Sequence, residues 1–487
     1  MDKVSKSQFS NSVLWRTLDM IFGKSFTVII SLIIARHLSQ DHYGLMTIWA
    51  VFVSIGNVLV IGGFDIVLIQ NKSIEENDWY TVRVSCFFRA LLLSILMQIC
   101  AGWISELYST EQLEPLLRIC TIDFFLQSNI SICIASISRH MSYKKLFIAD
   151  VISTVIGCSG SLIILALHMY SWVLISNLLF THVVYFLILM IFERKTVGFR
   201  FSKLSHKKLF APAFKTMTNN SIDIISGSIS SLVLGKKWSM TDVGYYNRAD
   251  KITQTFGLYT FDVISGILLP TFSSYQDDKE KLKRVFRQVF SLSCYIMFPI
   301  MIGLAICAKP LVSILLTDRW LPSVPIIVVL CVVYAMNPIR QMCLMLNYSI
   351  GQYRINTKIE FARLIITVLI AVFLLLYKAT DIILFPILVA VQFVVLAFLY
   401  LQSVSKGVGY KLSEVFHDVY PGLLISIVSL LPAAGIGFVD MPDIYKLICS
   451  IVSGSLLYII ISKTTNNQSF NYLILSIKQI QNKRKSK

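Results

Sequence analysis

The feature that most constrains this chain is a series of apolar segments, each about as long as a bilayer is thick. A helix needs about 20 apolar residues to cross the hydrocarbon core. Short polar linkers separate the segments, so we predict an all-α integral membrane protein with about 14 transmembrane helices. The predicted helices cover residues 12–35, 45–69, 82–105, 113–138, 146–167, 170–192, 209–234, 249–272, 287–308, 323–350, 359–377, 382–403, 419–438 and 445–462.

Composition supports the bilayer as the solvent of this chain. Of its 487 residues, 55% are hydrophobic and only 15% are charged, whereas soluble domains carry about 25% charged residues. A net charge of +17 would suggest nucleic acid as the partner of a soluble protein. Here the Lys and Arg residues gather in particular loops, so we predict that no nucleic acid binds and that membrane lipids surround the protein.

Loop charge predicts how the chain is oriented. If the N-terminus is cytoplasmic, the inner loops hold most of the Lys and Arg residues, including the basic stretches 193–208 and 273–286 and the tail after residue 463. The outer loops hold few, and the one near residues 106–114 is acidic. An excess of basic residues marks the cytoplasmic side. We therefore predict an even number of helices, with both termini in the cytoplasm.

Cysteine and histidine patterns indicate neither a metal site nor a disulfide framework. The ten cysteines lie in or at the ends of apolar segments without a C-x-x-C pair, and the seven histidines are scattered. Zinc sites need clustered Cys and His ligands. We therefore expect no metal and no cofactor. The longest linkers are too short for a catalytic domain, so we expect a transporter and not an enzyme.

Two stretches of the sequence match at an offset of 200 residues. Residues 32–44 read LIIARHLSQDHYG and residues 232–244 read LVLGKKWSMTDVG, with the Ser and the Gly at equal spacing. Six predicted helices separate the two stretches, and because six is even, both halves enter the membrane from the same side. We predict an N-terminal six-helix bundle over 1–192, a basic cytoplasmic linker over 193–208, a parallel C-terminal six-helix bundle over 209–403, and two extra helices with a basic cytoplasmic tail over 404–487.

Polar residues recur on one face of two helices that are equivalent under this repeat. Residues three or four positions apart share a helix face, and polar groups inside a membrane usually face a cavity or the interior of a bundle. We therefore predict that both helices line a polar cavity between the halves. The stripe in the first helix is Ser12, Arg16, Asp19, Gly23, Thr27 and Ser31, and that in the seventh is Pro212, Thr216, Asn219, Asp223, Gly227 and Ser231.

We predict that the side chains of this cavity bind the substrate. Basic groups in a hydrated cavity can pair with anionic groups of a substrate, and amide and carboxylate groups can hydrogen-bond its polar groups. Two alternatives remain open: Arg16 and Asp19 could form a structural pair at i,i+3, and Arg248 and Lys251 could be ordinary interfacial charges. The predicted site residues are Arg16, Asp19, Lys24, Lys215, Asn219, Asp223, Arg248 and Lys251.

Short motifs along nearly the whole chain carry a family resemblance. The chain resembles the bacterial polysaccharide transporter family, which contains the O-antigen and exopolysaccharide flippases of the multidrug/oligosaccharidyl-lipid/polysaccharide exporter superfamily. One departure from the family pattern is Thr317, where a glycine is expected, and it puts the local turn in doubt. The motifs are ARHLS at 35–39, YGL at 43–45, GFD to Gln at 63–70, RHMSYK at 139–144, DVGYYNRA at 242–249, LPTFS at 269–273 and Pro to Gly at 299–303.

The resemblance implies two bundles around a central V-shaped cavity, with the last two helices accommodating a lipid tail. It implies alternating-access movement of undecaprenyl-diphosphate-linked oligosaccharides from the inner to the outer leaflet of the bacterial inner membrane. Such a flippase serves the synthesis of lipopolysaccharide O-antigen, capsule or exopolysaccharide, alongside a polysaccharide polymerase and glycosyltransferases. The alternative is a cation-coupled multidrug exporter of the same superfamily, whose cavity would favour aromatic and acidic residues over basic ones.

Overall fold

The computed structural model describes residues 15, 26–71, 73–140, 142–193, 198–275, 278–377 and 381–474. For residues 70, 215, 218–220, 223, 258–271, 273 and 274, it describes the backbone but not the side chains. The regular elements in these ranges are helices, and no strand occurs among them. The chain divides into two compact units, Met1–Gly244 and Tyr245–Lys487.

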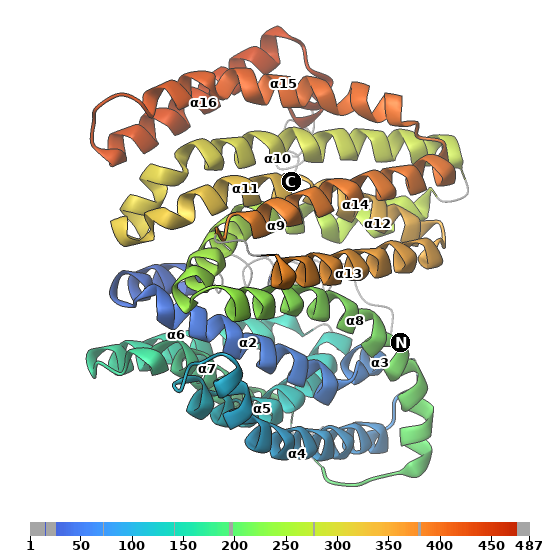
Figure 1. Ribbon diagram of the computed structural model, residues 1–487. Coiled ribbons are helices and arrows are strands. Elements are labelled where there is room, and N and C mark those ends of the chain that lie inside the picture. The colour runs from blue at the N-terminus through green and yellow to red at the C-terminus, as the bar shows by residue number, and fades with distance from the viewer. Residues whose placement is uncertain are drawn as a thin grey trace. The chain divides into compact units, whose positions relative to one another are not determined.

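The first unit contains the helix Phe26–His37 and helices α2 to α8 (Figure 1). Within it, α6 and α7 pack along each other, α4 packs on α5, and α2 contacts both α5 and α8. Its core is apolar and buries the side chains of Trp49, Phe64 and Phe124. The helices are α2 Gln40–Ile61, α3 Phe64–Gln70, α4 Glu76–Leu107, α5 Leu113–Arg139, α6 Tyr143–Ala166, α7 Tyr170–Phe192 and α8 Lys203–Lys237.

The second unit contains most of α9 and helices α10 to α16. Figure 1 shows α15 and α16 lying side by side along α10, which also packs against α11. Helix α14 packs against α11, α12 and α13. The elements are α9 Met240–Ser274, α10 Lys279–Leu315, the 3-10 helix η2 Asp318–Ser323, α11 Val324–Ala335, α12 Asn337–Ser349, α13 Tyr353–Leu376, α14 Leu384–Val408, α15 Leu412–Ile436 and α16 Asp443–Thr464.

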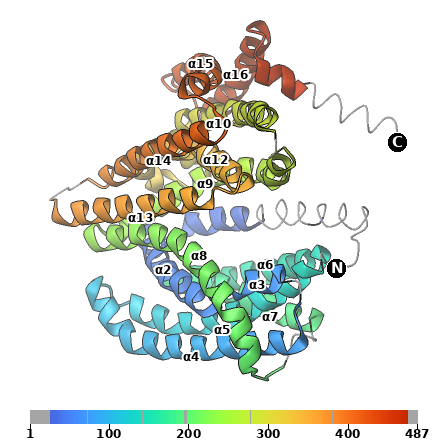
Figure 2. The same cartoon turned by 90° about the vertical axis from the view of Figure 1, so that its right-hand side faces the viewer.

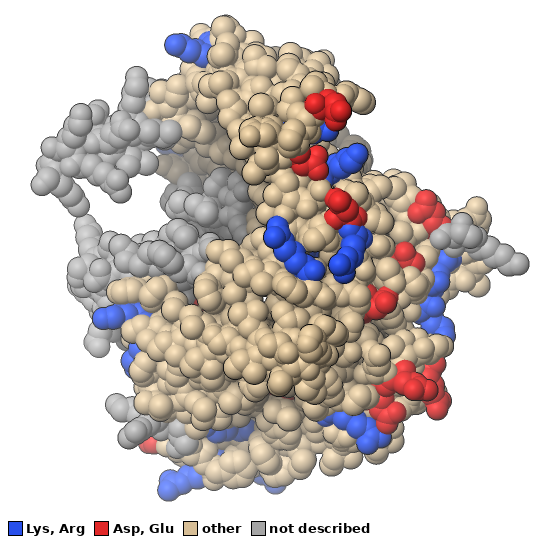
Figure 3. All heavy atoms as spheres, turned by 90° about the vertical axis from the view of Figure 1, so that its left-hand side faces the viewer, with Lys and Arg blue, Asp and Glu red and all other residues tan. Residues whose placement is uncertain are grey.

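Eleven helical segments of the described chain are long and apolar enough to cross a membrane, counting Asp318–Ser349, which contains η2, α11 and α12, as one segment. Their outer faces keep large apolar side chains exposed, and on α4 the side chains of Leu92, Ile99 and Trp103 are 67%, 74% and 68% exposed. Contiguous apolar surface of this kind suits lipid and not water. Figure 3 shows one face of the molecule formed mainly by uncharged residues, with charged side chains in scattered groups. The prediction of an all-α, multi-pass membrane protein is confirmed.

Two of the predicted spans are interrupted in the structure. Within the predicted span 45–69, α2 ends at Ile61, because Gly62 and Gly63 have φ values of 60° and 74°, and α3 then begins. Only glycine adopts this left-handed conformation readily. The predicted span 323–350 divides into α11 and α12 at Met336, and Pro338 follows at the start of α12. Proline fits the first turn of a helix but cannot continue one.

The two stretches that match at an offset of 200 share a local structure. In the first copy one helix ends at His37 and the next begins at Gln40, and in the second copy these positions are Lys237 and Met240. The contact between the copies is reciprocal and lies within the first unit. A Cβ on Gly44 would overlap the carbonyl oxygen of Met240, and a Cβ on Gly244 that of Gln40. Equivalent glycines therefore allow the close approach, which supports a repeat at these positions.

The turn after α10 contains the departure from the family pattern. Thr317 has a φ of 144°, in the region that favours glycine. Its N–H donates to the carbonyl of Val312 at 3.3 Å, and its carbonyl accepts from the N–H of Trp320 at 3.0 Å. The Trp320 side chain is buried. The turn therefore keeps its shape with threonine, at the expense of backbone strain.

Replacing Thr317 with glycine should stabilise the protein by about 1 kcal/mol, because the new residue adopts this φ without strain. The measurement is the midpoint of thermal unfolding in detergent, which should rise in the Thr317→Gly variant. Thr317→Ala is the control and should not raise it, since alanine keeps the Cβ that causes the strain. An unchanged midpoint in the glycine variant would contradict a strained turn.

Candidate functional site

Six of the predicted cavity residues have side chains that the structure does not describe. The first-helix residues Arg16, Asp19 and Lys24 lie outside the described residues altogether. The other three are on α8, where only the backbone at their positions is described: Lys215, Asn219 and Asp223. The binding roles of these six residues therefore remain predictions.

The two predicted residues on α9 have different surroundings. Arg248 is buried, with only 5% of its surface exposed. Lys251 is exposed, and its Nζ lies 3.3 Å from the Oε1 of Gln254, one turn further along the helix. The structure therefore describes one of these basic groups as buried and the other as exposed. Their predicted roles in substrate binding stay untested.

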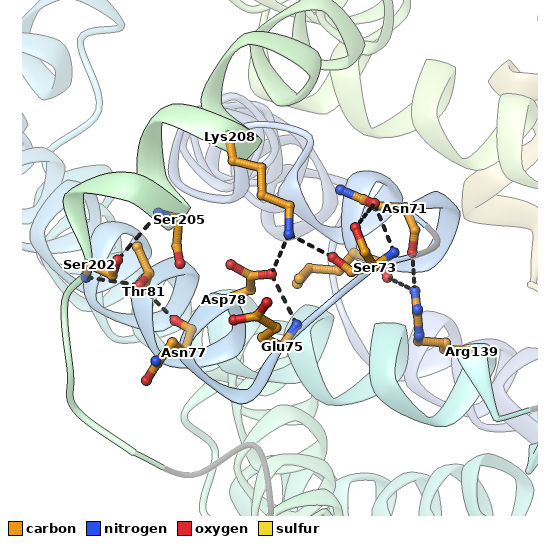
Figure 4. Close-up of polar contacts among 11 residues, drawn as sticks. Asn71, Ser73, Glu75, Asn77, Asp78, Thr81, Arg139, Ser202, Ser205 and Lys208 are labelled. Carbon is orange, nitrogen blue, oxygen red and sulfur yellow. Dashed lines mark hydrogen bonds and ion pairs between the residues drawn. The ribbon is translucent and has the colours of Figure 1, made fainter.

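Helix α8 is attached to the rest of the first unit at both ends. Near its start, the Lys208 Nζ lies 3.1 Å from Oδ2 of Asp78 and donates to the carbonyl of Ser73 at 2.6 Å (Figure 4). At its end, the Lys236 Nζ donates to the carbonyl of Leu107 at 2.8 Å, where a cation favourably meets the C-terminus of α4. Between these ends the helix contains Pro212, and Figure 2 shows its ribbon changing direction.

Side-chain caps fix the starts of α4 and α8 next to each other. Asp78 accepts a hydrogen bond from the Glu75 N–H at 3.1 Å and so caps α4. Ser202 caps α8, since its Oγ accepts from the Ser205 N–H at 3.3 Å. The Ser202 N–H in turn donates to the Thr81 Oγ1 of α4 at 3.1 Å (Figure 4). These bonds set the direction in which α8, with its polar stripe, leaves the start of α4.

Arg139, the first residue of the motif 139–144, ends α5 and holds the end of α3. Its Nη1 donates to the carbonyls of Leu68 at 2.9 Å and Asn71 at 2.5 Å. Figure 4 shows this guanidinium reaching the loop that follows α3. A basic side chain is favourable at the C-terminus of a helix. The arginine of this motif therefore positions helices.

His206, in the first turns of α8, faces α4. Its Nδ1 lies 3.2 Å from the Ser85 Oγ, and its ring packs near that of Phe64, with the centroids 6.3 Å apart. Burial, assisted by the positive charge of Arg89, lowers the pKa of His206 below its usual value. The imidazole is therefore neutral at pH 7.

A carboxylate is buried inside the first unit with partners from two other helices. Asp123 on α5 has no exposed surface. Its Oδ1 lies 2.5 Å from Nδ1 of His182 on α7, and its Oδ2 accepts from Nδ2 of Asn57 on α2 at 2.8 Å. The Nε2 of Gln127 on α5 lies 2.9 Å from the Nε2 of His182. Sequence spacing could not reveal this cluster, because its members come from three distant segments.

The second unit contains a partly buried ionic cluster on α12, α13 and α14. The Glu360 Oε1 lies 2.8 Å from the Nη2 of Arg340 and accepts from the Tyr400 hydroxyl at 2.7 Å. Its Oε2 lies 2.7 Å from the Nε of Arg363. One carboxylate thus joins two guanidinium groups, which reduces the cost of partly removing the three charges from water. The charges of Glu360 and Arg363 were evident in the sequence, but their partnership was not.

Helices α10, α15 and α16 enclose an apolar groove. Its volume is about 510 Å³, and Gly303 of α10 and Gly454 of α16 lie along it with leucine and isoleucine side chains. A second cavity, of about 570 Å³, is lined by the same three helices and by the residues after α16. There the Arg287 guanidinium pairs through its Nε and Nη2 with the two carboxylate oxygens of Asp418, both at 2.7 Å. Helices α15 and α16 therefore border both the apolar groove and the polar cavity.

The described helices form a bundle with ionisable groups paired in its interior and a groove along its last helices. A solved structure of the lipid II flippase MurJ, in an inward closed conformation, matches 95% of this chain and 100% of its own, with a TM-score of 0.74 at 15% identity. An inward-facing multidrug resistance transporter of the MATE family and MOP superfamily matches with a TM-score of 0.60 at 14% identity, over 81% and 98% of the two chains. These likenesses show the fold.

Residues 33–325 match the family model described as polysaccharide biosynthesis protein, and the chain belongs to this family. The lipopolysaccharide biosynthesis protein WzxC of Escherichia coli strain K12 is 22% identical over 303 residues, 62% of each chain. The succinoglycan biosynthesis transport protein ExoT of Rhizobium meliloti strain 1021 is 21% identical over 326 residues, 66% of each chain. Each match thus spans slightly less than two thirds of the relative. The resemblance inferred from the short motifs is confirmed.

Proposed function

We propose that this protein moves undecaprenyl-diphosphate-linked oligosaccharides from the inner to the outer leaflet of the bacterial cytoplasmic membrane. The product would supply lipopolysaccharide O-antigen, capsule or exopolysaccharide synthesis, with a polymerase and glycosyltransferases as working partners. The observation that carries the proposal is the apolar groove of α10, α15 and α16, in a chain whose fold is that of a lipid II flippase over 95% of its length.

Such a substrate has a polyprenyl tail, a diphosphate and an oligosaccharide, and these parts need different surroundings in the protein. The polyprenyl tail can stay in lipid or in an apolar groove, whereas the diphosphate and the sugars need a polar path through the hydrocarbon. The groove suits the tail, since α10, α15 and α16 line it with apolar side chains. Arg16, Lys24 and Lys215 are the proposed partners of the diphosphate. Amide and carboxylate groups would then hydrogen-bond the sugars, with Asn219 and Asp223 as the proposed residues.

The proposed topology adds three further helices to the eleven apolar spans. The described part of the first, Phe26–His37, is apolar but short, and α8 and α9 also fall outside the eleven. Counted as spans, they complete the predicted fourteen, with both termini in the cytoplasm. The proposed repeats cover 1–192 and 209–403, and transport follows from rocking one repeat against the other.

The membrane potential is one source of energy for this transport. Moving one charge across 100 mV changes the free energy by about 2.3 kcal/mol, and an inside-negative potential pushes an anionic diphosphate outward. Proton or sodium entry is the alternative source.

A second candidate function, cation-coupled export of drugs, is favoured by one observation, the match to the MATE-family fold. A strain that lacks the gene distinguishes them, since only a drug exporter would change drug resistance without changing surface polysaccharide.

Deleting the gene should make lipid-linked oligosaccharide accumulate and surface polysaccharide fall, because the carrier then stays in the inner leaflet. Both are measured, by mass spectrometry of lipid extracts and by surface labelling. A plasmid copy should restore export, and an Arg16→Ala copy should restore at most about a tenth of it, since a phosphate-pairing cation is lost. Arg118→Ala is the control, because Arg118 forms an exposed ion pair with Glu114. Normal export in the deletion strain would contradict the proposal, and normal export with Arg16→Ala would remove Arg16 from the mechanism.

Filling the groove should slow the movement of substrates that have long tails. A Cβ on Gly303 would meet only the Leu430 side chain, at 3.9 Å, so Gly303→Leu extends into the groove without a backbone clash. In proteoliposomes this variant should flip an undecaprenyl substrate several-fold more slowly but a short-prenyl analogue at the normal rate. Gly435→Leu on α15 is the control, since a Cβ there has no neighbour within 4 Å. Equal slowing of both substrates would show that the groove does not hold the tail.

A further inference from the structure

A polar cavity of about 570 Å³ lies where α15 begins and α16 ends, and the proposed transport gives it no role. We propose that it binds a phospholipid of the surrounding bilayer, with the phosphate among its polar side chains and an acyl chain along α15. In the proposed topology this end of the helices is cytoplasmic, so the lipid belongs to the inner leaflet. The site does not depend on which substrate the protein moves.

The lining of the cavity changes from polar to apolar along α15. His417 and Asp418 lie at one end, and the apolar lining of the same helix reaches Val428. At a rise of about 1.5 Å per residue, the two ends are roughly 16 Å apart. This gradient fits a molecule with a polar head and an apolar chain. The apolar lining residues are Pro421, Leu424, Ile425 and Val428 of α15 and Ile461 of α16.

The polar end holds hydrogen-bond donors that the described part of the chain leaves free. The Asn467 Oδ1 accepts from the N–H of Ser469 at 3.0 Å and from that of Phe470 at 3.3 Å. The Asn466 Oδ1 accepts from the Asn471 Nδ2 at 2.8 Å. Each lining amide therefore uses its oxygen within the protein and keeps its NH₂ group for a ligand. Three more lining side chains form no hydrogen bond with a described residue: Ser291, His417 and Gln468.

The charge of the cavity suits a phosphodiester better than a diphosphate. Arg287 is the one Lys or Arg among the described lining residues, and Asp418 neutralises it through two hydrogen bonds of 2.7 Å. Beside this pair, the Lys283 Nζ lies 2.8 Å from the Oε2 of Glu414. A diphosphate, with its higher charge, would meet no unpaired Lys or Arg of the described lining. Neutral N–H and O–H donors can hold the single charge of a phosphodiester.

The cavity is separate from the apolar groove proposed for the substrate tail. Successive residues of a helix are turned by about 100° around its axis. The faces of α15 that line the two spaces are therefore roughly 140° apart. A phospholipid in the cavity and a substrate tail in the groove can be bound at the same time. On α15, Pro421, Ile425 and Val428 line the cavity, whereas Leu430 and Ala433 line the groove.

Residues from three parts of the second unit would contact the bound lipid. Ser291 is on α10, His417 is on α15, and Asn467 follows α16. The side chains of Leu424 and Val428 are 39% and 49% exposed, so an acyl chain beside them stays in contact with the bilayer. The lipid therefore joins the end of α16 to α10 and α15, and its binding should stabilise the folded protein.

The first test maps where the lipid binds. The purified full-length protein is delipidated in detergent and irradiated with phosphatidylethanolamine that carries a photoreactive group in one acyl chain. Mass spectrometry should find the label on the peptide of residues 417–428. Diacylglycerol with the same chain lacks the phosphate and should label this peptide about tenfold less. Labelling of α4, whose exposed apolar side chains need no phosphate, should be the same with both lipids. Equal labelling of residues 417–428 by both would overturn the proposal.

The variant Asn467→Asp removes a donor and keeps the local hydrogen bonds. Aspartate retains the Oδ1 that accepts from Ser469 and Phe470, but it has no NH₂ group and brings a negative charge to the phosphate. Labelling of residues 417–428 should therefore fall about tenfold. Asn77→Asp is the matched control, because Asn77 is exposed at the start of α4, and it should be labelled normally. Full labelling of Asn467→Asp would refute the assigned site.

Thermal unfolding gives a second measurement on the same proteins. Adding phosphatidylethanolamine should raise the unfolding midpoint of the delipidated protein and of Asn77→Asp, because a ligand that binds the folded state stabilises it. At the same lipid concentration, Asn467→Asp should show a clearly smaller rise. Equal rises in all three proteins would contradict a lipid bound through Asn467.

A competition experiment distinguishes the phospholipid from the lipid that the protein is proposed to transport. Undecaprenyl diphosphate, added at the concentration of the photoreactive phospholipid, should leave the labelling of residues 417–428 unchanged. Displacement of the phospholipid would assign the cavity to the transported lipid and overturn the proposal. A protein that binds the phospholipid but flips no lipid-linked oligosaccharide would contradict the proposed function and support the lipid site.

Discussion

An ionisable side chain inside a bilayer must be hydrated or find a partner, and the arrangement of helices in this protein depends on that constraint. Asp123 meets it with an imidazole from α7 and an amide from α2. Glu360 meets it with two guanidinium groups from α12 and α13. In each unit the partners come from different helices, so satisfying one charge fixes how several helices pack.

The same constraint separates the parts of the chain that hold the structure from those proposed to hold the substrate. Lys208, Lys236 and Arg139 each have a carbonyl or carboxylate partner that fixes the end of a helix. Between its two attached ends, α8 holds the polar stripe of Thr216 to Ser231 across the region expected to span the bilayer. Because contacts at both ends hold α8 in place, the polar side chains of the stripe can face a polar path without forming ion pairs that fix the helix. The outer helices α15 and α16, by contrast, provide an apolar groove suited to a hydrocarbon tail.

Much of the fold could be predicted from the sequence, because apolar segments of membrane-spanning length leave few alternatives. The match between residues 32–44 and 232–244 also indicated where two helices break, and Gly44 and Gly244 each lie against the backbone of the other stretch. The interruption after Ile61 was missed. An apolar run predicts a membrane-spanning segment, but it does not show where two glycines adopt positive φ values and end a helix. The partners of Asp123 could not be predicted, because tertiary packing alone brings residues 57, 123 and 182 together.

The most direct test of this account is the outward movement of a lipid-linked oligosaccharide by the purified protein. The oligosaccharide is placed in the inner leaflet of sealed liposomes, and its appearance outside is followed by cleavage with an enzyme that cannot cross the bilayer. The account predicts that cleavage proceeds at a rate proportional to the amount of protein in the membrane. A rate equal to that of protein-free liposomes, with a membrane potential and with a pH gradient, would contradict it.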